Sequence, residues 1–214
     1  MIVVIDLLIK LLLSYLIGSV VGSLLIGKLK GIDIRTAGSG NAGATNALRT
    51  QGAAFAVGTM IIDVAKGVIA AGVIANLSFT TPTMTNLETQ LFCAFAAAVG
   101  HCYPVFHGFR GGKGAGTLIG GIAVVFPWVA LAMFGVWALL LMGFGYVGLA
   151  TVVAGLSFPV FVFFLIDGSA ALVALAISIA MFLAYTHRSN LERLIQGSEN
   201  RFERARIIGR LFSR

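Results

Sequence analysis

Hydrophobic residues run along this chain in long stretches, each ended by a short cluster of glycine, proline or charged residues. A stretch of roughly 17 to 25 apolar residues is long enough to cross a bilayer as a helix. Such stretches fall near Leu7 to Ile26 and Gly52 to Ala75, and a shorter one lies near Leu91 to Val105. The first part of the chain therefore predicts three membrane-spanning helices.

The later part of the chain is apolar almost throughout, from Gly116 to Tyr185. It is interrupted at Pro127, at residues 143 to 148, and at residues 167 and 168. Four helices fit between these breaks, which makes about seven in all. The pattern predicts an all-α integral membrane protein that forms a single polytopic domain over residues 1 to 214. Merging the short pieces around Pro127 gives six spans, and hydropathy alone leaves that alternative open.

Composition supports the membrane interpretation. The 214 residues are 58% hydrophobic and only 11% charged, and the mean hydropathy is +0.98. These values lie far outside the range of soluble domains. The first apolar stretch carries Asp6 and Lys10 and runs well past a short signal core, so we interpret it as a span rather than a cleaved signal peptide.

Basic residues indicate which side of the membrane each loop faces. Thirteen of the 15 Lys and Arg residues lie within 28 to 49, 110 to 113 and 188 to 214, and none lies in the connection from 76 to 88. Seven spans place the three basic segments on one side, which the positive-inside rule makes cytoplasmic. Six spans would scatter them over both faces. We therefore expect an external N-terminus, a cytoplasmic C-terminus and three cytoplasmic motif segments, at about 28 to 51, 101 to 117 and 187 to 214.

The formal charge of +7 raises the question of a nucleic-acid partner. No basic stretch is interleaved with aromatic residues in the manner of a nucleic-acid-binding module, so we expect anionic lipid headgroups instead. His101, Cys102 and His107 lack a fourth ligand at a convincing spacing, so no metal is expected. No cofactor is expected either.

The first glycine-rich segment is Gly-Ser-Gly-Asn-Ala-Gly-Ala-Thr-Asn-Ala-Leu-Arg, at residues 38 to 49. Glycines let successive backbone N–H groups turn toward one oxyanion, and the hydroxyls, amides and arginine add donors. Alternatively, the segment is a tight turn followed by a helix cap, although capping and anion binding use the same N–H groups. The candidate phosphate-binding residues are Ser39, Gly40, Asn41, Gly43, Thr45, Asn46 and Arg49.

A second glycine-rich segment runs from Arg110 to Thr117. It lacks the Walker A spacing, because His107 stands where that motif has glycine and Gly114 where it has Ser or Thr. Gly112 and Lys113 still predict an ammonium group held close to an anion by a backbone without side chains. The alternative is a glycine hinge with an interfacial lysine.

A third polar segment begins where the last apolar stretch ends, at His187. His187 and Asn190 are three residues apart and would share one helix face, so both are candidate ligands of one group, although a histidine at a helix end is often unremarkable. Within the second span, Asp63 and Lys66 are also three apart. Charged groups at membrane depth usually face a partner or a wet cavity, so this pair either binds itself or supports the substrate site.

These motifs together resemble one protein family. Ser-Gly-Asn-x-Gly-Ala-Thr-Asn at 39 to 46, Gly-Gly-Lys-Gly at 111 to 114, and His-x-x-Asn-x-x-Arg-Leu with Gly-Ser-Glu at 187 to 199 are similar to the bacterial acyl-phosphate:glycerol-3-phosphate acyltransferases. The resemblance covers essentially the whole chain. Ser198 stands where the family usually has threonine.

The resemblance implies a seven-helix enzyme of the bacterial inner membrane that starts phospholipid synthesis. It would move a fatty acyl group from acyl phosphate to the 1-hydroxyl of glycerol 3-phosphate, giving lysophosphatidic acid and phosphate. It also implies that the substrate phosphates are held by Ser39, Arg49, Lys113, His187 and Asn190. Lys113, His187 and Arg49 are the catalytic candidates, with Asp63, Lys66 and Glu199 as candidate supporting residues.

The sequence favours direct attack of the glycerol hydroxyl on the acyl carbonyl. No Ser-His-Asp arrangement is evident and both cysteines lie in apolar surroundings, so a covalent acyl-enzyme is not expected. A substrate phosphate oxygen or His187 would take the hydroxyl proton. A soluble acyl-phosphate-producing enzyme that docks on the arginine-rich tail is a further candidate partner.

An organic-phosphate or anion transporter is the alternative function. Such folds usually have paired repeats and discontinuous helices that meet near the bilayer midplane, whereas the polar motifs here sit at one face. The enzyme hypothesis requires that the three motif segments fold back to one rim of the membrane.

Overall fold

The computed structural model describes residues 2–79, 86–166 and 168–211, and within these ranges it contains helices and no strands. The all-helical architecture expected from the sequence is therefore confirmed. Two compact units divide the chain, Met1–Pro127 and Trp128–Arg214, and each is described by itself. The expectation of a single domain stays a prediction.

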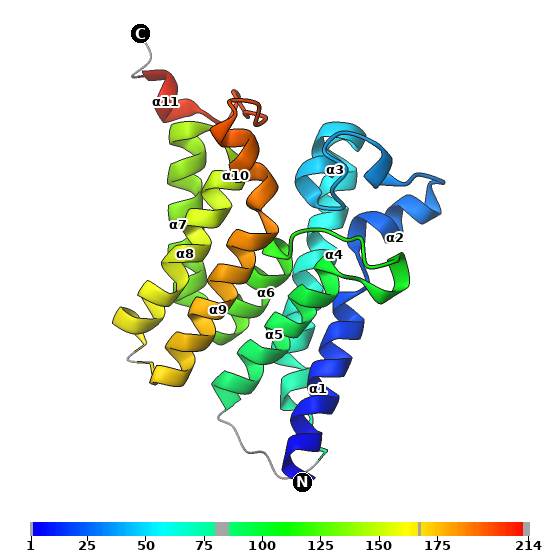
Figure 1. Cartoon of the computed structure of the whole chain (residues 1–214), viewed down its shortest axis with the longest axis vertical. Coiled ribbons are helices and arrows are strands. Elements are labelled where there is room, and N and C mark those ends of the chain that lie inside the picture. Colours follow the sequence, from blue (N-terminus) through cyan, green and yellow to red (C-terminus); the bar gives the residue numbers. More distant parts are fainter. Residues whose placement is uncertain (1, 80–85, 167, 212–214) are drawn as a thin grey trace. The chain divides into compact units, whose positions relative to one another are not determined.

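The first unit is a helical bundle in which α4 is central (Figure 1). Helix α4 packs against α3, α5 and α6, and α1 packs against α5. Short 3₁₀ helices lie in the connections, at Ile34–Thr36, Ile74–Asn76 and Val105–His107. The α-helices of this unit are α1 (Ile2–Gly18), α2 (Gly22–Leu29), α3 (Ala44–Gln51), α4 (Ala53–Gly72), α5 (Asn86–Cys102) and α6 (Ala115–Val125).

Glycines set the close approach of helices in this unit. A Cβ atom on Gly67 of α4 would overlap the backbone of Thr117, and one on Gly120 of α6 would overlap the backbone of Val64. Each helix thus presents a glycine to the backbone of the other. This small-residue packing suits apolar helices, because in lipid their association depends on van der Waals contact rather than on the hydrophobic effect.

The first apolar stretch is not the single straight span expected for residues 7 to 26. It forms two helices, α1 and α2, bent by 44° at the break between Gly18 and Gly22. No proline causes this bend. The backbone groups freed at the break bond instead to polar side chains of α4, which are described below with the functional site.

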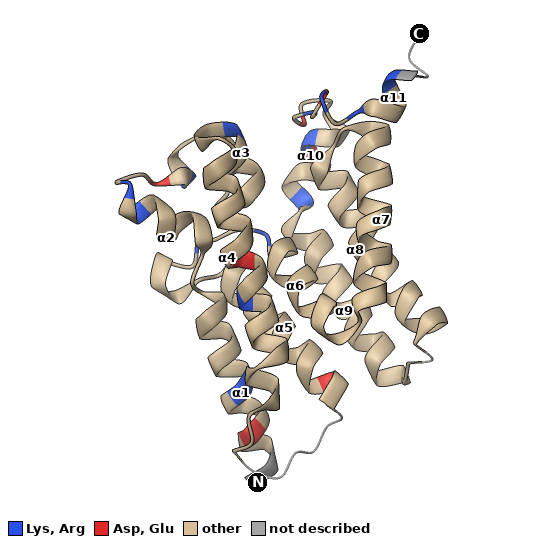
Figure 2. Ribbon diagram, turned by 180° about the vertical axis from the view of Figure 1, so that it is seen from behind, with Lys and Arg blue, Asp and Glu red and all other residues tan. Residues whose placement is uncertain are grey.

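The second unit contains three long helices and a polar C-terminal segment (Figure 1). Helix α7 begins at Pro127, where the missing N–H of proline costs no helical hydrogen bond. Figure 2 shows α7, α8 and α9 without charged residues along their described lengths. The elements of this unit are α7 (Pro127–Phe144), α8 (Val147–Leu165), α9 (Ala170–Thr186), α10 (Arg188–Ile195) and α11 (Ile207–Leu211).

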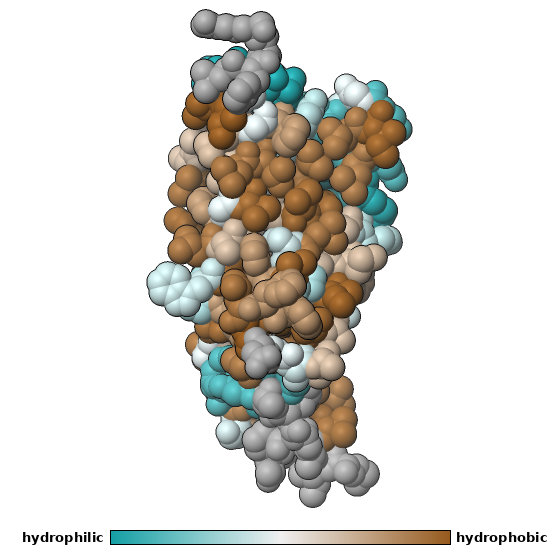
Figure 3. Space-filling model, turned by 90° about the vertical axis from the view of Figure 1, so that its left-hand side faces the viewer, coloured by the Kyte–Doolittle hydropathy of each residue, from teal (hydrophilic) through white to brown (hydrophobic). Residues whose placement is uncertain are grey.

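Large hydrophobic side chains are exposed on the outer side of α7 and α8. Trp128 is 78% exposed, Phe134 56% and Phe164 75%, and Figure 3 shows hydrophobic residues predominating over this face. A soluble protein rarely exposes so large an apolar area. The face is therefore suited to contact with lipid chains.

The four helices expected between Gly116 and Tyr185 are confirmed as α6 to α9, and the break expected at 143 to 148 lies between α7 and α8. The expected break at Asp167 falls outside the described residues. Within the described ranges, four helices are long and apolar enough to cross a bilayer, or up to six if each bent pair is one span. Helix α6 has only 11 residues, about half of the ~20 that a span needs. Seven crossings and the orientation of the termini therefore stay predictions.

Candidate functional site

The first glycine-rich segment is organised around the buried side chain of Asn46. Its amide nitrogen donates to the carbonyls of Ile34, Ala37 and Asn41 at 3.0 to 3.2 Å. Its carbonyl oxygen accepts from the backbone N–H of Ser39 at 2.9 Å. Both polar atoms of the side chain are thus occupied within the loop, and one residue fixes the path of the chain from 34 to 41.

The remaining candidates of this segment surround the start of α3. Gly40 has a φ of +70°, a conformation that L side chains rarely adopt. The Asn41 side chain accepts from the N–H of Gly43, which is the N-cap residue of α3. The loop therefore leads directly into a helix N-terminus, where backbone N–H groups and the helix dipole favour an anion. Ser39 is exposed there, while Thr45 and Arg49 are partly buried on α3.

The second glycine-rich segment is pinned to the end of α5. The N–H of Gly111 donates to the carbonyl of Cys102, and the N–H of Gly112 to that of His101, both at 3.1 Å. These bonds satisfy carbonyls that a helix C-terminus leaves without intrahelical partners. Gly114, with a φ of +84°, is the N-cap residue of α6. Partly buried Lys113 is consequently held between the end of one helix and the start of the next.

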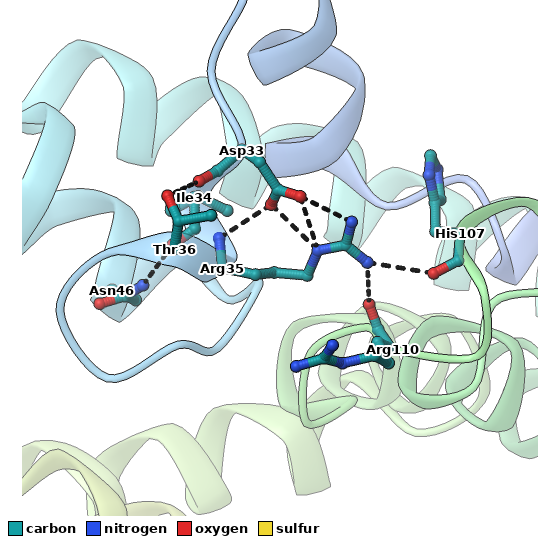
Figure 4. A network of polar contacts seen from close by, with 7 residues as sticks. All are labelled: Asp33, Ile34, Arg35, Thr36, Asn46, His107 and Arg110. Atoms are coloured by element: carbon teal, nitrogen blue, oxygen red, sulfur yellow. Dashed lines mark hydrogen bonds and ion pairs between the residues drawn. The ribbon is translucent and has the colours of Figure 1, made fainter.

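Arg35 ties the two glycine-rich segments together (Figure 4). One guanidinium nitrogen donates to the carbonyls of His107 and Arg110, each at 3.0 Å. The other side of the guanidinium group binds the carboxylate of Asp33 through Nε and Nη2. The first two motif segments, far apart in the sequence, therefore adjoin in the first unit.

Electrostatics keep this connection charged near neutral pH. The hydrogen bonds that Arg35 donates lower the pKa of Asp33 from 3.8 to about 2. The same bonds raise the pKa of Arg35. Because both groups stay ionised, Asp33 orients the guanidinium group toward the second loop with a charge-assisted, bidentate contact.

Asp63 and Lys66 of α4 and His101 of α5 form a buried polar cluster next to the second loop. The Lys66 ammonium is 3.1 Å from Asp63 Oδ1 and 2.7 Å from His101 Nδ1. All three residues are at most 4% exposed. The expected pairing of Asp63 with Lys66 is confirmed, and the structure adds His101 as a third member.

In the second unit, His187 is buried at the C-cap of α9, and its Nδ1 lies 2.9 Å from the carbonyl of Leu183. A carbonyl only accepts, so Nδ1 carries a proton. Asn190 Nδ2 donates to Glu199 Oε1 at 2.7 Å, and Arg193 Nε donates to Glu199 Oε2 at 2.6 Å. The candidate supporting residue Glu199 thus holds Asn190 in place.

Two residues of this site were not among those expected from the sequence. Arg35 stands in a basic segment with no motif of its own, so nothing local marks its partners 72 and 75 residues away. His101 lies in the last turn of an apolar helix, shortly before the second glycine-rich segment. This position was the one sign in the sequence that the residue supports the site. Within the described residues there is no group of three His, Cys, Asp or Glu side chains able to hold a metal ion.

Comparisons with known proteins point to the same family as the sequence motifs do. The model of a family described as glycerol-3-phosphate acyltransferase matches residues 8–197. The glycerol-3-phosphate acyltransferase of Syntrophotalea carbinolica is 40% identical, covering 91% of this chain and 97% of its own. That of Aquifex aeolicus is 42% identical, covering 88% and 95%.

Two solved structures are also similar, and both are of PlsY, an integral membrane glycerol 3-phosphate acyltransferase. Its glycerol 3-phosphate form has a TM-score of 0.82 at 38% identity and covers 97% of this chain and 99% of its own. Its lysophosphatidic acid form has a TM-score of 0.81 at 38% identity, with coverage of 94% and 98%.

Proposed function

This chain belongs to the glycerol-3-phosphate acyltransferase family, and on that basis we propose that it transfers a fatty acyl group from acyl phosphate to the 1-hydroxyl of glycerol 3-phosphate. The products are lysophosphatidic acid and inorganic phosphate, and the reaction begins phospholipid synthesis. The observation that carries the proposal is the likeness, over 97% of this chain, to a membrane acyltransferase structure described as its glycerol 3-phosphate form. No relative described above is a transporter.

The geometry of the first unit supports two phosphate-containing substrates. Each glycine-rich segment leads into a helix N-terminus, at Gly43 for α3 and Gly114 for α6. Two such termini, joined by Arg35, offer backbone donors for two anions on one side of the unit. This arrangement suits a reaction that brings two phosphate compounds together.

In this proposal the candidate residues of the first unit divide into three groups. Asn46 orders the loop, because its polar atoms are bonded to the backbone of residues 34 to 41. Lys113 and Arg49 supply fixed positive charge. Ser39, Asn41 and Thr45 complete the phosphate contacts with hydroxyl and amide groups. The backbone N–H groups of Gly40, Gly43 and Gly112 bond within the protein, and these glycines let the backbone approach the phosphates closely.

His187 and Asn190 are the substrate-binding residues of the second unit. The proton on His187 Nδ1 leaves the lone pair of the neutral ring on Nε2, which is the basic nitrogen. Glu199 accepts from Asn190 and so directs the amide group. His187 is positioned by backbone contact and Asn190 by a carboxylate, so both side chains have fixed orientations.

The reaction proceeds by direct attack. The oxygen of the 1-hydroxyl bonds to the acyl carbonyl carbon, the bond from that carbon to the phosphate oxygen breaks, and inorganic phosphate departs. The hydroxyl proton passes to His187 Nε2 or to a phosphate oxygen of a substrate. Because phosphate is a good leaving group, orientation of the substrates and neutralisation of their charge supply most of the rate.

Both the acyl donor and the product carry a long hydrocarbon chain. Burying such a chain in apolar surroundings stabilises it by about 0.8 kcal/mol per CH₂, which explains why this enzyme lies in a membrane. We assign it to the bacterial inner membrane, with the N-terminus external and the three motif segments cytoplasmic. A soluble enzyme that produces acyl phosphate would dock on the arginine-rich C-terminal segment.

A reconstituted assay with radiolabelled glycerol 3-phosphate tests the function. Purified protein in proteoliposomes with acyl phosphate should convert the label into lysophosphatidic acid. Faster acylation from acyl-CoA would contradict the donor, and trapping an acyl-enzyme would contradict direct attack. Intact label inside the vesicles, without lipid product, would identify a transporter instead.

A further inference from the structure

The break between α1 and α2 and the second glycine-rich loop meet at one buried cluster. At the end of α1, the carbonyls of Gly18 and Val20 each accept from Lys66 Nζ at 2.9 Å. At the start of α2, the N–H of Gly22 donates to Asp63 Oδ1 at 3.1 Å. The cation thus sits at a helix C-terminus and the anion at a helix N-terminus, which are the ends that the two helix dipoles favour.

The other interruption is the second glycine-rich loop, which rests on His101. His101 Nδ1 lies 2.7 Å from Lys66 Nζ and 3.3 Å from Asp63 Oδ1, so both charged groups hold the same edge of the ring. The Nε2 edge of the ring faces Gly112, where a Cβ atom would overlap it. Gly112 is also bonded through its N–H to the carbonyl of His101. The ring therefore limits how closely the loop that carries Lys113 can approach α5.

We infer that Asp63, Lys66 and His101 are positioning residues that hold the two phosphate-binding loops in register. Lys66 and Asp63 fix the bend that directs α2 toward the first loop. His101 sets how closely the second loop approaches α5. The inference rests on the proposed function for its kinetic consequences, but its geometric part concerns the two loops themselves.

Energetics favour a positioning role over a role in stability. Ionised groups within an apolar helical protein are costly to bury, and a buried ion pair often stabilises no more than packed hydrophobic residues would. This cluster spans two helices and contacts two separate chain segments, the α1–α2 break and the second loop. Its contacts are therefore suited to fixing relative positions.

The same unit offers a matched comparison in the Asp6–Lys10 pair of α1. These residues are each 4% exposed and their charged atoms lie 2.6 Å apart. Asp6 Oδ1 accepts from the N–H of Phe79, at the opposite end of α1 from the bend. The pair resembles Asp63–Lys66 in burial and charge, but its bond is to the connection after α4 rather than to the break between α1 and α2.

The first experiment is a double-mutant cycle between His101 and Gly112. In the wild type, Gly112→Ala should lower kcat/KM by about 10²-fold, because displacement of a substrate-binding group by about 1 Å has this cost. In a His101→Ala background the same substitution should cost less than about 3-fold relative to His101→Ala alone, because the space is then open. Equal losses in both backgrounds would overturn the inference. Gly135→Ala, where an added Cβ contacts nothing within 4 Å, is the control.

The second experiment compares Lys66→Met with Lys10→Met in the purified protein. Both should lower the melting temperature, but only Lys66→Met should raise the KM for glycerol 3-phosphate, by about tenfold or more, as expected when binding groups are displaced. Identical KM values for the two folded variants would overturn the positioning role.

A distance measurement separates this inference from the proposed function. Spin labels at Lys30→Cys and Phe106→Cys, both exposed, report the spacing of the two loop regions in a protein with Cys93 and Cys102 replaced by alanine. Double electron–electron resonance should show a shifted or broader distribution of label-to-label distances with Lys66→Met and an unchanged distribution with Lys10→Met. Unchanged distances in both would refute the inference even if the enzyme is active. If the wild type makes no lipid product, the proposed function fails, and the distances still decide the geometric claim.

Discussion

Arg35 uses its whole guanidinium group for contacts that a lysine cannot reproduce. It binds Asp33 through Nε and Nη2 and two carbonyls of the second loop through Nη1. A single ammonium group lacks this planar fork. We therefore expect Arg35→Lys to raise the KM for glycerol 3-phosphate several-fold at unchanged protein yield, as measured in the reconstituted assay. Arg110→Lys is the control because Arg110 contributes its carbonyl to the bond, and an equal effect of both substitutions would argue against the tie.

Asp33 predicts how this connection depends on pH. Its pKa is lowered from 3.8 to about 2 in the folded protein. A lowered pKa means that the contact contributes fully above pH 3.8 and is lost as pH falls from 3.8 toward about 2. The KM of the wild type and of Asp33→Asn should therefore differ by a constant factor across the neutral range. A ratio that changes near neutral pH would show that another group controls the loop.

In the proposed function, Lys113 and Arg49 supply positive charge to the substrate phosphates. Replacing either by alanine should reduce turnover by at least about 10²-fold, in line with the loss of one electrostatic donor, while the helical circular dichroism spectrum is retained. Lys28→Ala, an exposed lysine at the end of α2, is the control and should keep its activity. Wild-type rates from folded Lys113→Ala would remove the second loop from the mechanism.

Among the elements, α4 and α6 form a close helix pair and so give a stability prediction. An added methyl at Gly120 meets the backbone of Val64, which has no rotamer to change. Gly120→Ala should therefore lower the free energy of unfolding by about 1 to 3 kcal/mol, the usual cost of overpacking. Thermal melting in detergent measures this change. Gly135→Ala, at an open position of α7, should show no loss, and a similar drop there would point to a general effect of the methyl group.

The bend between α1 and α2 shows why a break in a helix is harder to predict than the apolar character of the segment. Residues 7 to 26 are apolar enough for one continuous span, and nothing local marks a break. The break exists because Lys66 and Asp63, more than 40 residues away, bind the freed carbonyls and N–H group. Hydropathy measures the cost of placing side chains in lipid, and it carries no information on such distant partners.

At the scale of the whole molecule, the open question of topology is whether α6 crosses the membrane. Lys30 and Ser198 lie on the same side if all six helices from α4 to α9 cross, and on opposite sides if α6 alone fails to cross. We expect Lys30→Cys and Ser198→Cys to react with an impermeant maleimide only after cells are permeabilised, and Ser78→Cys to react in intact cells. All three positions are exposed. Labelling of positions 30 and 198 from opposite sides would show that an odd number of these helices cross. The short helix α6 is then the one expected not to cross.

The amino-acid sequence by itself determined the helices, most of their ends and the chemistry of the loops. These properties are local: apolar length selects a membrane helix, Pro127 and the glycines at 143 to 148 end one and begin the next, and clustered glycines and small polar residues form turns that lead into helices. The three motifs also sufficed to indicate the family, because their order and residue types survive without any knowledge of contacts.

Only the tertiary structure decided which residues hold those loops in place. Arg35 reaches carbonyls more than 70 positions away, Lys66 and His101 meet across two helices, and Asn46 proves to be bonded within its own loop. Such contacts depend on how helices pack, and packing is fixed by shape, as where glycines admit a neighbouring backbone. A side chain's role as ligand or as support follows from its neighbours in space, which no linear pattern specifies.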